Sequence, residues 1–186
     1  MLKNSLRRDL RLEEEAKRHN EHLSEHDPLT GLPNRKRFLR RLGEMIEERS
    51  DHDVVGVLFL DLDGFKPVND QHGHAAGDHV LRVVAERMCK TIRSSDLAAR
   101  YGGDEFVVAL PLTGQGDAVV ERVTAALANA IGQPIDFNGH KLQVAASIGV
   151  ATCPLDGDTA AELVHAADKH MYELKRSRQQ QVPRAA

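Results

Sequence analysis

The sequence predicts an α+β domain in which helices flank an antiparallel central sheet, preceded by a helical extension at the N-terminus. Its 186 residues accommodate one domain plus a short extension, and about 150 residues suffice to bury a core without disulfides. Helix and strand patterns follow one another as α-β-α-β-β-α-β-β-α. The central β-α-β-β-α-β part has the split βαβ order of ferredoxin-like folds, so we expect an antiparallel sheet with helices on one face.

Residues 1–26 form the predicted extension, because they contain no Gly or Pro and are rich in charged residues. Leu2, Leu6 and Leu10 give a narrow apolar stripe at helical spacing. A coiled-coil strand and a frayed charged helix both fit this pattern; the first would make a signalling stalk or a dimerisation arm. Residues 27–178 form the predicted globular domain, and residues 179–186 form a tail.

The first elements of the domain each have a local signal. The loop 27–35 opens with Asp-Pro, and the residue before a proline avoids the α region, so the extension ends there. Asn34 is a good N-cap for a helix that ends near residue 50. Residues 54–60 (VVGVLFL) are continuously apolar and predict a strand that is buried on both faces.

The remaining elements follow from periodicity and turn signals. Asn138 and Gly139 mark a hairpin, whose second arm we expect to run on to Val150. The final helix is expected to bury Leu174 on its inner face. The predicted elements are a helix at about 75–93, strands at 97–101 and 105–110, a helix at 113–131, strands at 135–137 and 141–150, and a helix from residue 159.

Composition excludes several classes of function. A net charge of −3 does not suit a surface that coats DNA or RNA, and 4% aromatic residues are too few for a base-stacking platform. The sequence has no apolar run long enough for a membrane-spanning segment, and its charged N-terminus does not resemble a signal peptide. We therefore expect a cytoplasmic protein without direct DNA or RNA binding, in which Cys89 and Cys153 are buried thiols.

Two acidic motifs carry the candidate chemistry. Asp61 and Asp63 end the first strand, and Asp104 and Glu105 follow a Gly-Gly hairpin turn. In the split βαβ order both motifs lie on neighbouring central strands, so the carboxylates converge at one end of the sheet. Removing uncompensated charges from water costs several kcal/mol each, and a hard divalent cation such as Mg²⁺ offsets that cost. Two separate, solvated acidic turns are the alternative.

Nearby residues complete a candidate nucleotide site. Gly102 and Gly103 let a ligand approach the backbone closely. Lys66 can meet a phosphate as a point charge, whereas Asn69 and Asp78 offer an amide and a carboxylate that suit the N–H donors of guanine. Each of these residues also fits an ordinary role as a helix cap or a polar surface residue.

Together these residues resemble the GGDEF domain of diguanylate cyclases. The resemblance extends over about residues 27–178, in the motif order of the family. The matching motifs are DPLTGLPNR (27–35), DLDGFK (61–66), ND (69–70), GHAAGD (73–78), RYGGDEF (100–106), SIGV (147–150) and the helical segment 167–175.

The resemblance implies a palm-like fold and an enzyme that condenses two GTP into cyclic di-GMP and two pyrophosphates. Carried over by position, Asp61, Asp104 and the Leu62 carbonyl would hold Mg²⁺, with Mn²⁺ as a substitute. Either Asp104 or Glu105 would be the general base, a choice that the sequence leaves open. The implied substrate-binding residues are Asn69, Asp78, Lys66, Gly102, Gly103 and Lys175.

The resemblance also implies a homodimer and product inhibition. One domain binds one GTP and cannot close the ring alone, so two domains must face each other about a two-fold axis. The extension would then raise the effective concentration of the two domains. Arg93 and Asp96 look like the RxxD site that binds cyclic di-GMP in the family; a surface ion pair is the alternative.

The sequence departs from the family pattern at few positions. His72 stands where an aromatic residue is usual, and no glycine follows Lys175, which leaves open whether Arg178 reaches the phosphates. One alternative function is a catalytically silent GGDEF module that binds GTP or cyclic di-GMP and acts through a partner. Another is a cyclase with a mixed purine product, which Asn69 and Asp78 disfavour. The sequence does not identify the input signal.

Overall fold

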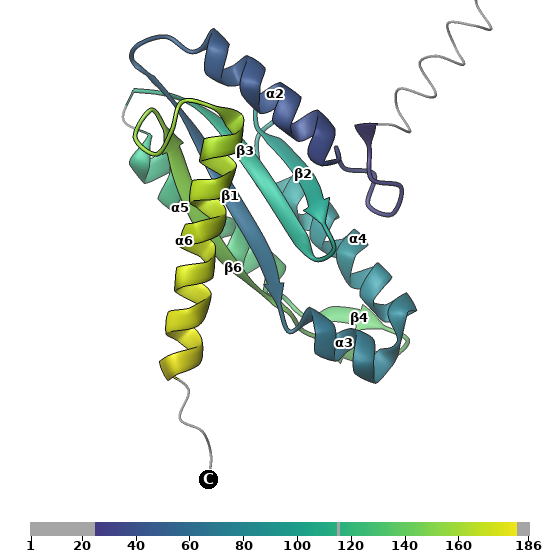
Figure 1. The fold of residues 1–186 in the computed structure, drawn as a ribbon. Coiled ribbons are helices and arrows are strands. Elements are labelled where there is room, and N and C mark those ends of the chain that lie inside the picture. Colours follow the sequence, from purple (N-terminus) through teal and green to yellow (C-terminus); the bar gives the residue numbers. More distant parts are fainter. Residues whose placement is uncertain (1–24, 115, 182–186) are drawn as a thin grey trace, which may run out of the picture.

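The computed structural model describes residues 25–114 and 116–181 (Figure 1). Residues 1–24 of the predicted N-terminal helix and residues 182–186 of the predicted tail lie outside this described part. Within it, no helix is long and apolar enough to cross a membrane.

An antiparallel four-stranded sheet forms the centre of the domain, as predicted. Its strands are β1 (Asp53–Asp63), β2 (Leu97–Gly102), β3 (Glu105–Thr113) and β6 (Ala145–Cys153). They are arranged in the order β2-β3-β1-β6, and every neighbouring pair is antiparallel (Figure 1). This order is that of a split βαβ fold, with β1 and β3 in the middle.

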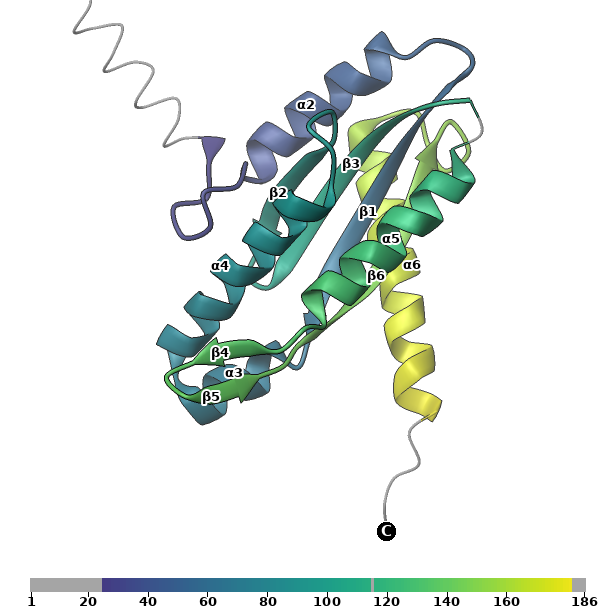
Figure 2. The same cartoon turned by 180° about the vertical axis from the view of Figure 1, so that it is seen from behind.

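Helices cover both faces of the sheet, so the expectation of helices on one face is wrong. Helices α4 (His74–Thr91) and α5 (Asp117–Ile131) lie on one face, and α2 (Arg35–Glu48) and α6 (Ala160–Gln181) lie on the other (Figures 1 and 2). The reason is the apolar β1. Leu58 and Leu60 pack into one hydrophobic cluster, while Val57 and Phe59 pack into the other, so each face needs a cover.

A short helix, α3 (Phe65–His72), was not predicted. It lies between two glycines with positive φ, Gly64 at 86° and Gly73 at 81°. Glycine adopts this conformation without the steric penalty of a Cβ atom, so these two residues set off α3 from β1 and from α4. The segment that carries Asn69 is therefore a separate helix beside α4.

The predicted hairpin exists, but its second arm is shorter than expected. Strands β4 (Ile135–Phe137) and β5 (His140–Leu142) form a separate two-stranded sheet. The turn between them has Asn138 and Gly139 at φ of 49° and 82°, as the Asn-Gly signal predicted. The chain then leaves the hairpin, and β6 pairs with β1 in the main sheet, because its apolar residues are buried there.

Several predicted boundaries shift. Strand β1 includes Asp61 and Asp63, and β3 continues to Thr113, so α5 begins at Asp117 rather than at residue 113. Helix α6 starts after a capping box, in which Thr159 Oγ1 accepts from the Glu162 N–H (3.3 Å) and Glu162 accepts from the Thr159 N–H (3.1 Å). It runs to Gln181, three residues into the predicted tail.

Two burial predictions are wrong. Leu174 is 45% exposed, because it lies on a side of α6 that faces an open groove rather than the core. Cys89 is exposed on α4, whereas Cys153 is buried as expected. Both thiols are free.

Candidate active site

The acidic motifs meet at one end of the sheet. The register of β1 and β3 sets Asp61 opposite Glu105, and the Leu62 N–H donates to the Asp104 carbonyl (3.3 Å). The predicted juxtaposition therefore follows from antiparallel pairing, since the end of β1 and the start of β3 are neighbours.

Lys175 of α6 is bonded to the strand-end carboxylates. Its Nζ donates a short hydrogen bond to Asp61 Oδ1 and lies 3.5 Å from Asp63 Oδ1. The side chains of Asp61 and Lys175 are 18% and 30% exposed, so water screens this pair only in part. The resemblance implied that Lys175 contacts a phosphate; in this structure it forms ion pairs with Asp61 and Asp63.

Asp63 has a second fixed contact. Ser147 of β6 donates its hydroxyl to Asp63 Oδ2 (2.6 Å), and Ser147 is 1% exposed. A buried hydroxyl needs a partner, so this bond also orients the carboxylate of Asp63. The serine of the SIGV motif thus holds the Asp63 side chain at the end of β1 by a hydrogen bond.

Two carboxyl groups at the site have raised pKa values. Burial, and then the charge of Asp61, raises the pKa of Asp104. Burial also raises the pKa of Glu105, with further contributions from Asp168, Asp61 and Asp104. The fold therefore places several partly buried carboxyl groups close together, although burial and mutual repulsion disfavour their charged forms. Such perturbed pKa values are common at functional sites.

Asp168 of α6 is a member of this cluster to which sequence reasoning assigned no role. Its charge acts on Glu105. It lies seven positions before Lys175, a spacing that places both residues on one face of a helix. This spacing could have predicted from the sequence that Asp168 lies near Lys175.

The cluster fits a divalent cation held in part by substrate. Among the described residues, no three His, Cys, Asp or Glu side chains are placed to hold a metal ion by themselves. Asp61, Asp104 and the Leu62 carbonyl offer hard oxygen ligands, and Mg²⁺ typically combines one or two carboxylates with substrate phosphates. The raised pKa values of Asp104 and Glu105 and the ion pair of Lys175 with Asp61 indicate that positive charge stabilises this cluster.

The Gly-Gly turn is anchored by Arg100. Its Nε and Nη2 donate to the Gly103 carbonyl (3.0 and 2.8 Å), and its Nη1 contacts both oxygens of Asp27 at 3.1 Å. Gly103 has a φ of 47°, which glycine adopts most easily. The Arg100–Asp27 pair thus connects the DPLTGLPNR loop to the turn that presents Asp104, a role that sequence reasoning did not assign.

A cavity of about 770 Å³ lies beside this turn. Gly102 and Gly103 contribute to its wall, together with Arg35, Lys36 and Tyr101. The Arg35 guanidinium lies 4.7 Å from the centroid of the Tyr101 ring, within cation–π distance.

Helices α3 and α4 bring the predicted guanine-binding residues to one place. Gly77 of α4 is buried, and a Cβ atom there would lie 2.0 Å from Asn69 Oδ1. Asn69 therefore packs directly against the α4 backbone, next to the position of Asp78. Lys66 is exposed on α3 and forms no ion pair among the described residues.

Arg93 and Asp96 lie in the turn that follows α4. The Asp96 carboxylate accepts from the Arg93 backbone N–H (2.8 Å), and the Asp96 N–H donates to the Arg93 carbonyl (3.0 Å). Their side chains do not form an ion pair in the described structure. The Arg93 side chain is thus exposed beside a carboxylate that the turn fixes.

Comparisons with known proteins agree on one family. Residues 24–181 match the family model of "Diguanylate cyclase, GGDEF domain". Diguanylate cyclase TpbB of Pseudomonas aeruginosa is 44% identical over 158 residues, which cover 83% of this chain and 36% of the relative. The chain spans 21%, 22% and 36% of the length of three curated relatives that it matches.

Solved structures share the fold. A sensory box/GGDEF family protein from Caulobacter crescentus has a TM-score of 0.80 and 40% identity, covering 82% of this chain and 99% of that chain. The coiled coil and GGDEF domain of DgcB from the same species, in complex with c-di-GMP, has a TM-score of 0.83 and 26% identity, covering 95% and 93%. These similarities confirm the α+β, palm-like fold.

Proposed function

Because this chain belongs to the GGDEF family of diguanylate cyclases, we propose that it condenses two GTP into cyclic di-GMP and two pyrophosphates. One observation carries the proposal: Asp61 of β1 lies opposite Glu105 of β3, next to Asp104 in the preceding turn, at the end of the sheet. The guanine-binding residues proposed on α3 and α4 follow directly after β1 in the chain. Lys175 from α6 adds a cation to the same cluster.

The metal proposed for this reaction is Mg²⁺, with Mn²⁺ as a substitute. Asp61, Asp104 and the carbonyl of Leu62 would hold it. When bound there, it would lower the pKa of the attacking 3′-hydroxyl and offset charge on the phosphates. Lys175 would then be released from Asp61 and would be free to contact a phosphate, which reconciles its observed ion pair with the role implied by the family.

The residues of the chain supply the proton transfer. The 3′-oxygen of one GTP forms a bond to the α-phosphorus of the other, and the bond from that phosphorus to the pyrophosphate leaving group breaks. The hydroxyl proton goes to Asp104 or Glu105. Their raised pKa values bring them closer to the working pH, which favours general base catalysis.

Specificity for guanine is assigned to Asn69 and Asp78. A carboxylate is an acceptor only, so Asp78 suits the N1–H and N2–H₂ donors of guanine and not the edge of adenine. The close contact of Asn69 with Gly77 fixes Asn69 relative to α4. Lys66 and the Gly102–Gly103 turn are proposed to contact phosphates.

The test is product analysis. Incubation of the chain with GTP and Mg²⁺, followed by chromatography, should give cyclic di-GMP and pyrophosphate in a one-to-two ratio. Asp104→Asn and Glu105→Gln should each lower the rate by roughly 100-fold or more, the range for a lost general base. Asp136→Asn, which changes an exposed acid on the β4–β5 hairpin, should leave the rate unchanged. GTP binding without product would instead identify a silent binding module.

Product inhibition is proposed at Arg93 and Asp96. The exposed guanidinium of Arg93 can stack on guanine or pair with phosphate, and the fixed carboxylate of Asp96 can accept from guanine N–H groups. Arg93→Ala should abolish inhibition by added cyclic di-GMP at unchanged initial rate. Inhibition that persists in Arg93→Ala would remove this assignment.

A further inference from the structure

The two edges of the main sheet differ. On the β2 edge, Arg100 forms a bridge with Asn34, and the Arg100 N–H donates to the Pro33 carbonyl (3.0 Å). The opposite edge is β6, which pairs with β1 on one side and with no other strand of the described chain on its outer side. Part of the β2 edge thus pairs with the loop before α2, whereas no strand of the described chain pairs with the outer side of β6.

Strand parity identifies the backbone groups on the open edge. The Leu62 N–H bonds to β3, so even-numbered residues of β1 direct their backbone groups to β3 and odd-numbered ones to β6. Odd residues of β1 pair with odd residues of β6, as Phe59 does with Gly149. The even residues of β6 therefore direct their N–H and C=O groups outward.

Three of these outward groups have partners. The Val150 carbonyl is contacted by Nδ1 of His170 (2.6 Å). The Thr152 N–H donates to Asp156 Oδ2 (2.7 Å), and the Thr152 carbonyl accepts from the Asp156 N–H (2.8 Å). The N–H and C=O groups of Ala146 and Ile148 and the N–H of Val150 have no hydrogen-bond partner in the described structure. These groups form an unpaired edge about one short strand in length.

Strand β6 has none of the usual features that block pairing. Its sequence, AASIGVATC, contains no charged residue and no proline, and its register with β1 is unbroken by a bulge. Exposed edge strands normally carry such features because a bare edge is a template for another strand. The absence of these features indicates that the edge is used.

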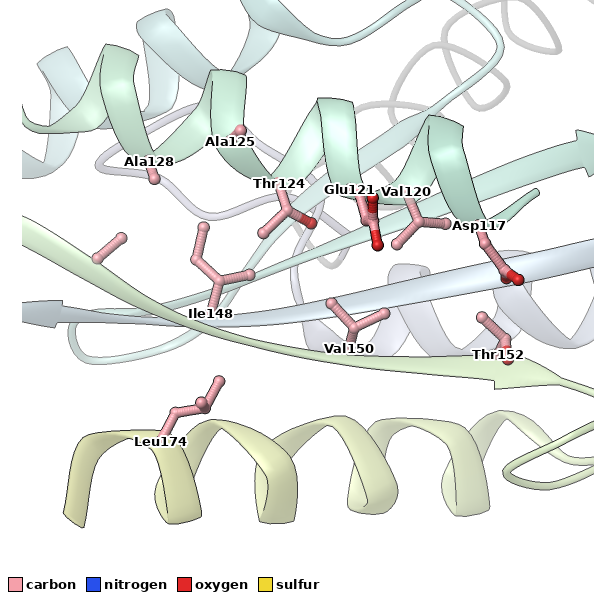
Figure 3. A pocket seen from close by; sticks show the side chains of 11 residues that line it. Asp117, Val120, Glu121, Thr124, Ala125, Ala128, Ile148, Val150, Thr152 and Leu174 are labelled. Carbon is pink, nitrogen blue, oxygen red and sulfur yellow. The ribbon is translucent and has the colours of Figure 1, made fainter. Parts of the chain in front are cut away.

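Cavities flank the edge on both of its faces. A groove of about 540 Å³ lies on the α5 side, between that helix and β6 (Figure 3). A second cavity, of about 470 Å³, lies on the α6 side and shares Ile148, Val150 and Leu174 with the first. Because side chains of a strand alternate between its two faces, an added strand would place one set of side chains in each cavity.

The residues that line the two cavities indicate which kind of segment could bind there. Ile148, Val150 and Leu174 make the shared surface apolar, while Asp117 and Glu121 on α5 make one rim acidic (Figure 3). Glu173 on α6 makes the rim of the second cavity acidic. Neither cavity is lined by Lys or Arg. A second copy of this edge would bring like charges together, whereas a basic segment would meet opposite ones.

The α5 groove also holds an unsatisfied polar atom. Thr124 Oγ1 is buried and has no hydrogen-bond partner in the described structure. Its side chain lies between Ala125 and Glu121 on the groove wall (Figure 3). Buried hydroxyls are normally paired, so a polar group from an occupant would complete this wall.

We propose that β6 is a docking edge for an extended segment of a partner protein, in which apolar residues alternate with Lys or Arg. The segment pairs with Ala146, Ile148 and Val150 by strand addition, places its apolar side chains in one cavity and directs its basic residues to the acidic rim of the other.

The probe is an acetylated, amidated eight-residue peptide in which Val and Ile alternate with Lys. Titrated into the full chain, it should bind and slow hydrogen exchange of the Ile148 amide at least tenfold. The same peptide N-methylated at every second amide cannot pair as a strand, so it should bind at least tenfold more weakly. A version with Glu in place of Lys should also bind at least tenfold more weakly.

Variants of the chain test the same contacts. Glu121→Gln combined with Glu173→Gln should weaken binding of the Lys peptide at least fivefold, and Glu47→Gln on α2 should not change it. Val150→Pro removes one outward N–H and leaves the bonds to β1 intact; it should weaken binding while product formation from GTP stays unchanged. Equal binding of the N-methylated peptide, no binding of the Lys peptide, or self-association through this edge would each overturn the proposal.

Discussion

At the residue scale, the acidic cluster depends on a cation that comes from a distant part of the chain. Asp61 and Asp63 lie on β1, and Lys175 is more than a hundred residues further on, in α6. Because residues two apart in a strand lie on the same face, the carboxylates of Asp61 and Asp63 are neighbours. Lys175 lies close to both of them. The proposed metal ion would therefore act on the same charges as Lys175.

Removing Lys175 should expose this competition. In EDTA, Lys175→Met should lower the free energy of unfolding by about 1–2 kcal/mol, because two partly buried carboxylates lose their cation. Mg²⁺ should then raise the melting temperature of the variant more than that of the wild type. The control is Lys141→Met, whose pair with Asp136 is exposed; denaturant unfolding should show little change. An equal Mg²⁺ effect in wild type and Lys175→Met would contradict the shared role.

The Arg100–Asp27 pair should make stability depend on pH. Burial alone would raise the pKa of Asp27, but hydrogen bonds from Thr30 and Arg100 outweigh it and hold that pKa below its usual value. A lowered pKa stabilises the folded state above the unfolded-state pKa, and this stabilisation is lost as pH falls through the folded-state value. Asp27→Asn should therefore cost about 1–2 kcal/mol at pH 7 and progressively less as the pH falls below about 4.

Urea unfolding at several pH values would check this prediction. Asp51→Asn, at an exposed position, is the matched control and should follow the wild type throughout. A deficit in Asp27→Asn that stays constant from pH 7 to pH 3 would show that the charge of Asp27 is not what stabilises the loop.

At the element scale, α3 shows where sequence reasoning was incomplete. The residues of the candidate guanine site could be selected from their chemistry, and the long helices and β1 could be predicted from periodicity. The eight-residue α3 could not, because it is too short for a periodic pattern and is bounded by glycines that signal turns. Its position against α4 depends on Val68, which is buried in the core with residues of α4, and on the close approach of Asn69 to Gly77.

Substitution of Gly77 should separate the effect of helix propensity from the effect of this contact. Alanine is favoured over glycine in a helix interior by about 1 kcal/mol, so propensity alone predicts stabilisation. In Gly77→Ala the new Cβ would collide with Asn69, and we expect KM for GTP to rise roughly tenfold through loss of about one hydrogen bond. Gly43→Ala in α2, with no atom near its Cβ, should stabilise the chain without changing KM. An unchanged KM in Gly77→Ala would contradict the role of Asn69.

At this scale the turn of the hairpin was predicted correctly, whereas the pairing of β6 and the burial of Leu174 on α6 were not. The Asn-Gly signal located the β4–β5 turn, because both residues favour positive φ. The destination of the following strand was missed, since pairing of β6 with β1 is a long-range event that no local pattern encodes. Leu174 was misplaced for the same reason: periodicity identifies an apolar face but not whether another element covers it.

At the scale of the whole molecule, the proposed reaction requires two domains. One acidic cluster with one nucleotide cannot form both phosphodiester bonds, so the active species should be a dimer. Specific activity should therefore fall when the chain is diluted. Deletion of residues 1–24 should move this fall to about tenfold higher protein concentration, because the extension is proposed to raise the effective concentration of the domains.

Initial rates across a dilution series, with sedimentation of the same samples, would measure this effect. Adding back a concentrated solution of the deletion variant should restore its activity, which separates lost association from lost folding. Specific activity that is independent of concentration in both proteins would rule out the proposed role of the extension.

The sequence alone determined the identities of the candidate reactive groups and their local structure. Asp61, Asp104, Glu105 and the Gly-Gly turn are set by residue type and by signals that span only a few positions. Tertiary structure decided the rest: that Lys175 meets Asp61, that Arg100 joins Asp27 to the turn, that helices cover both faces of the sheet, and that β6 has an open edge. The physical reason is range, because propensity and periodicity act between near neighbours, whereas these contacts join residues that only packing of the whole chain brings together.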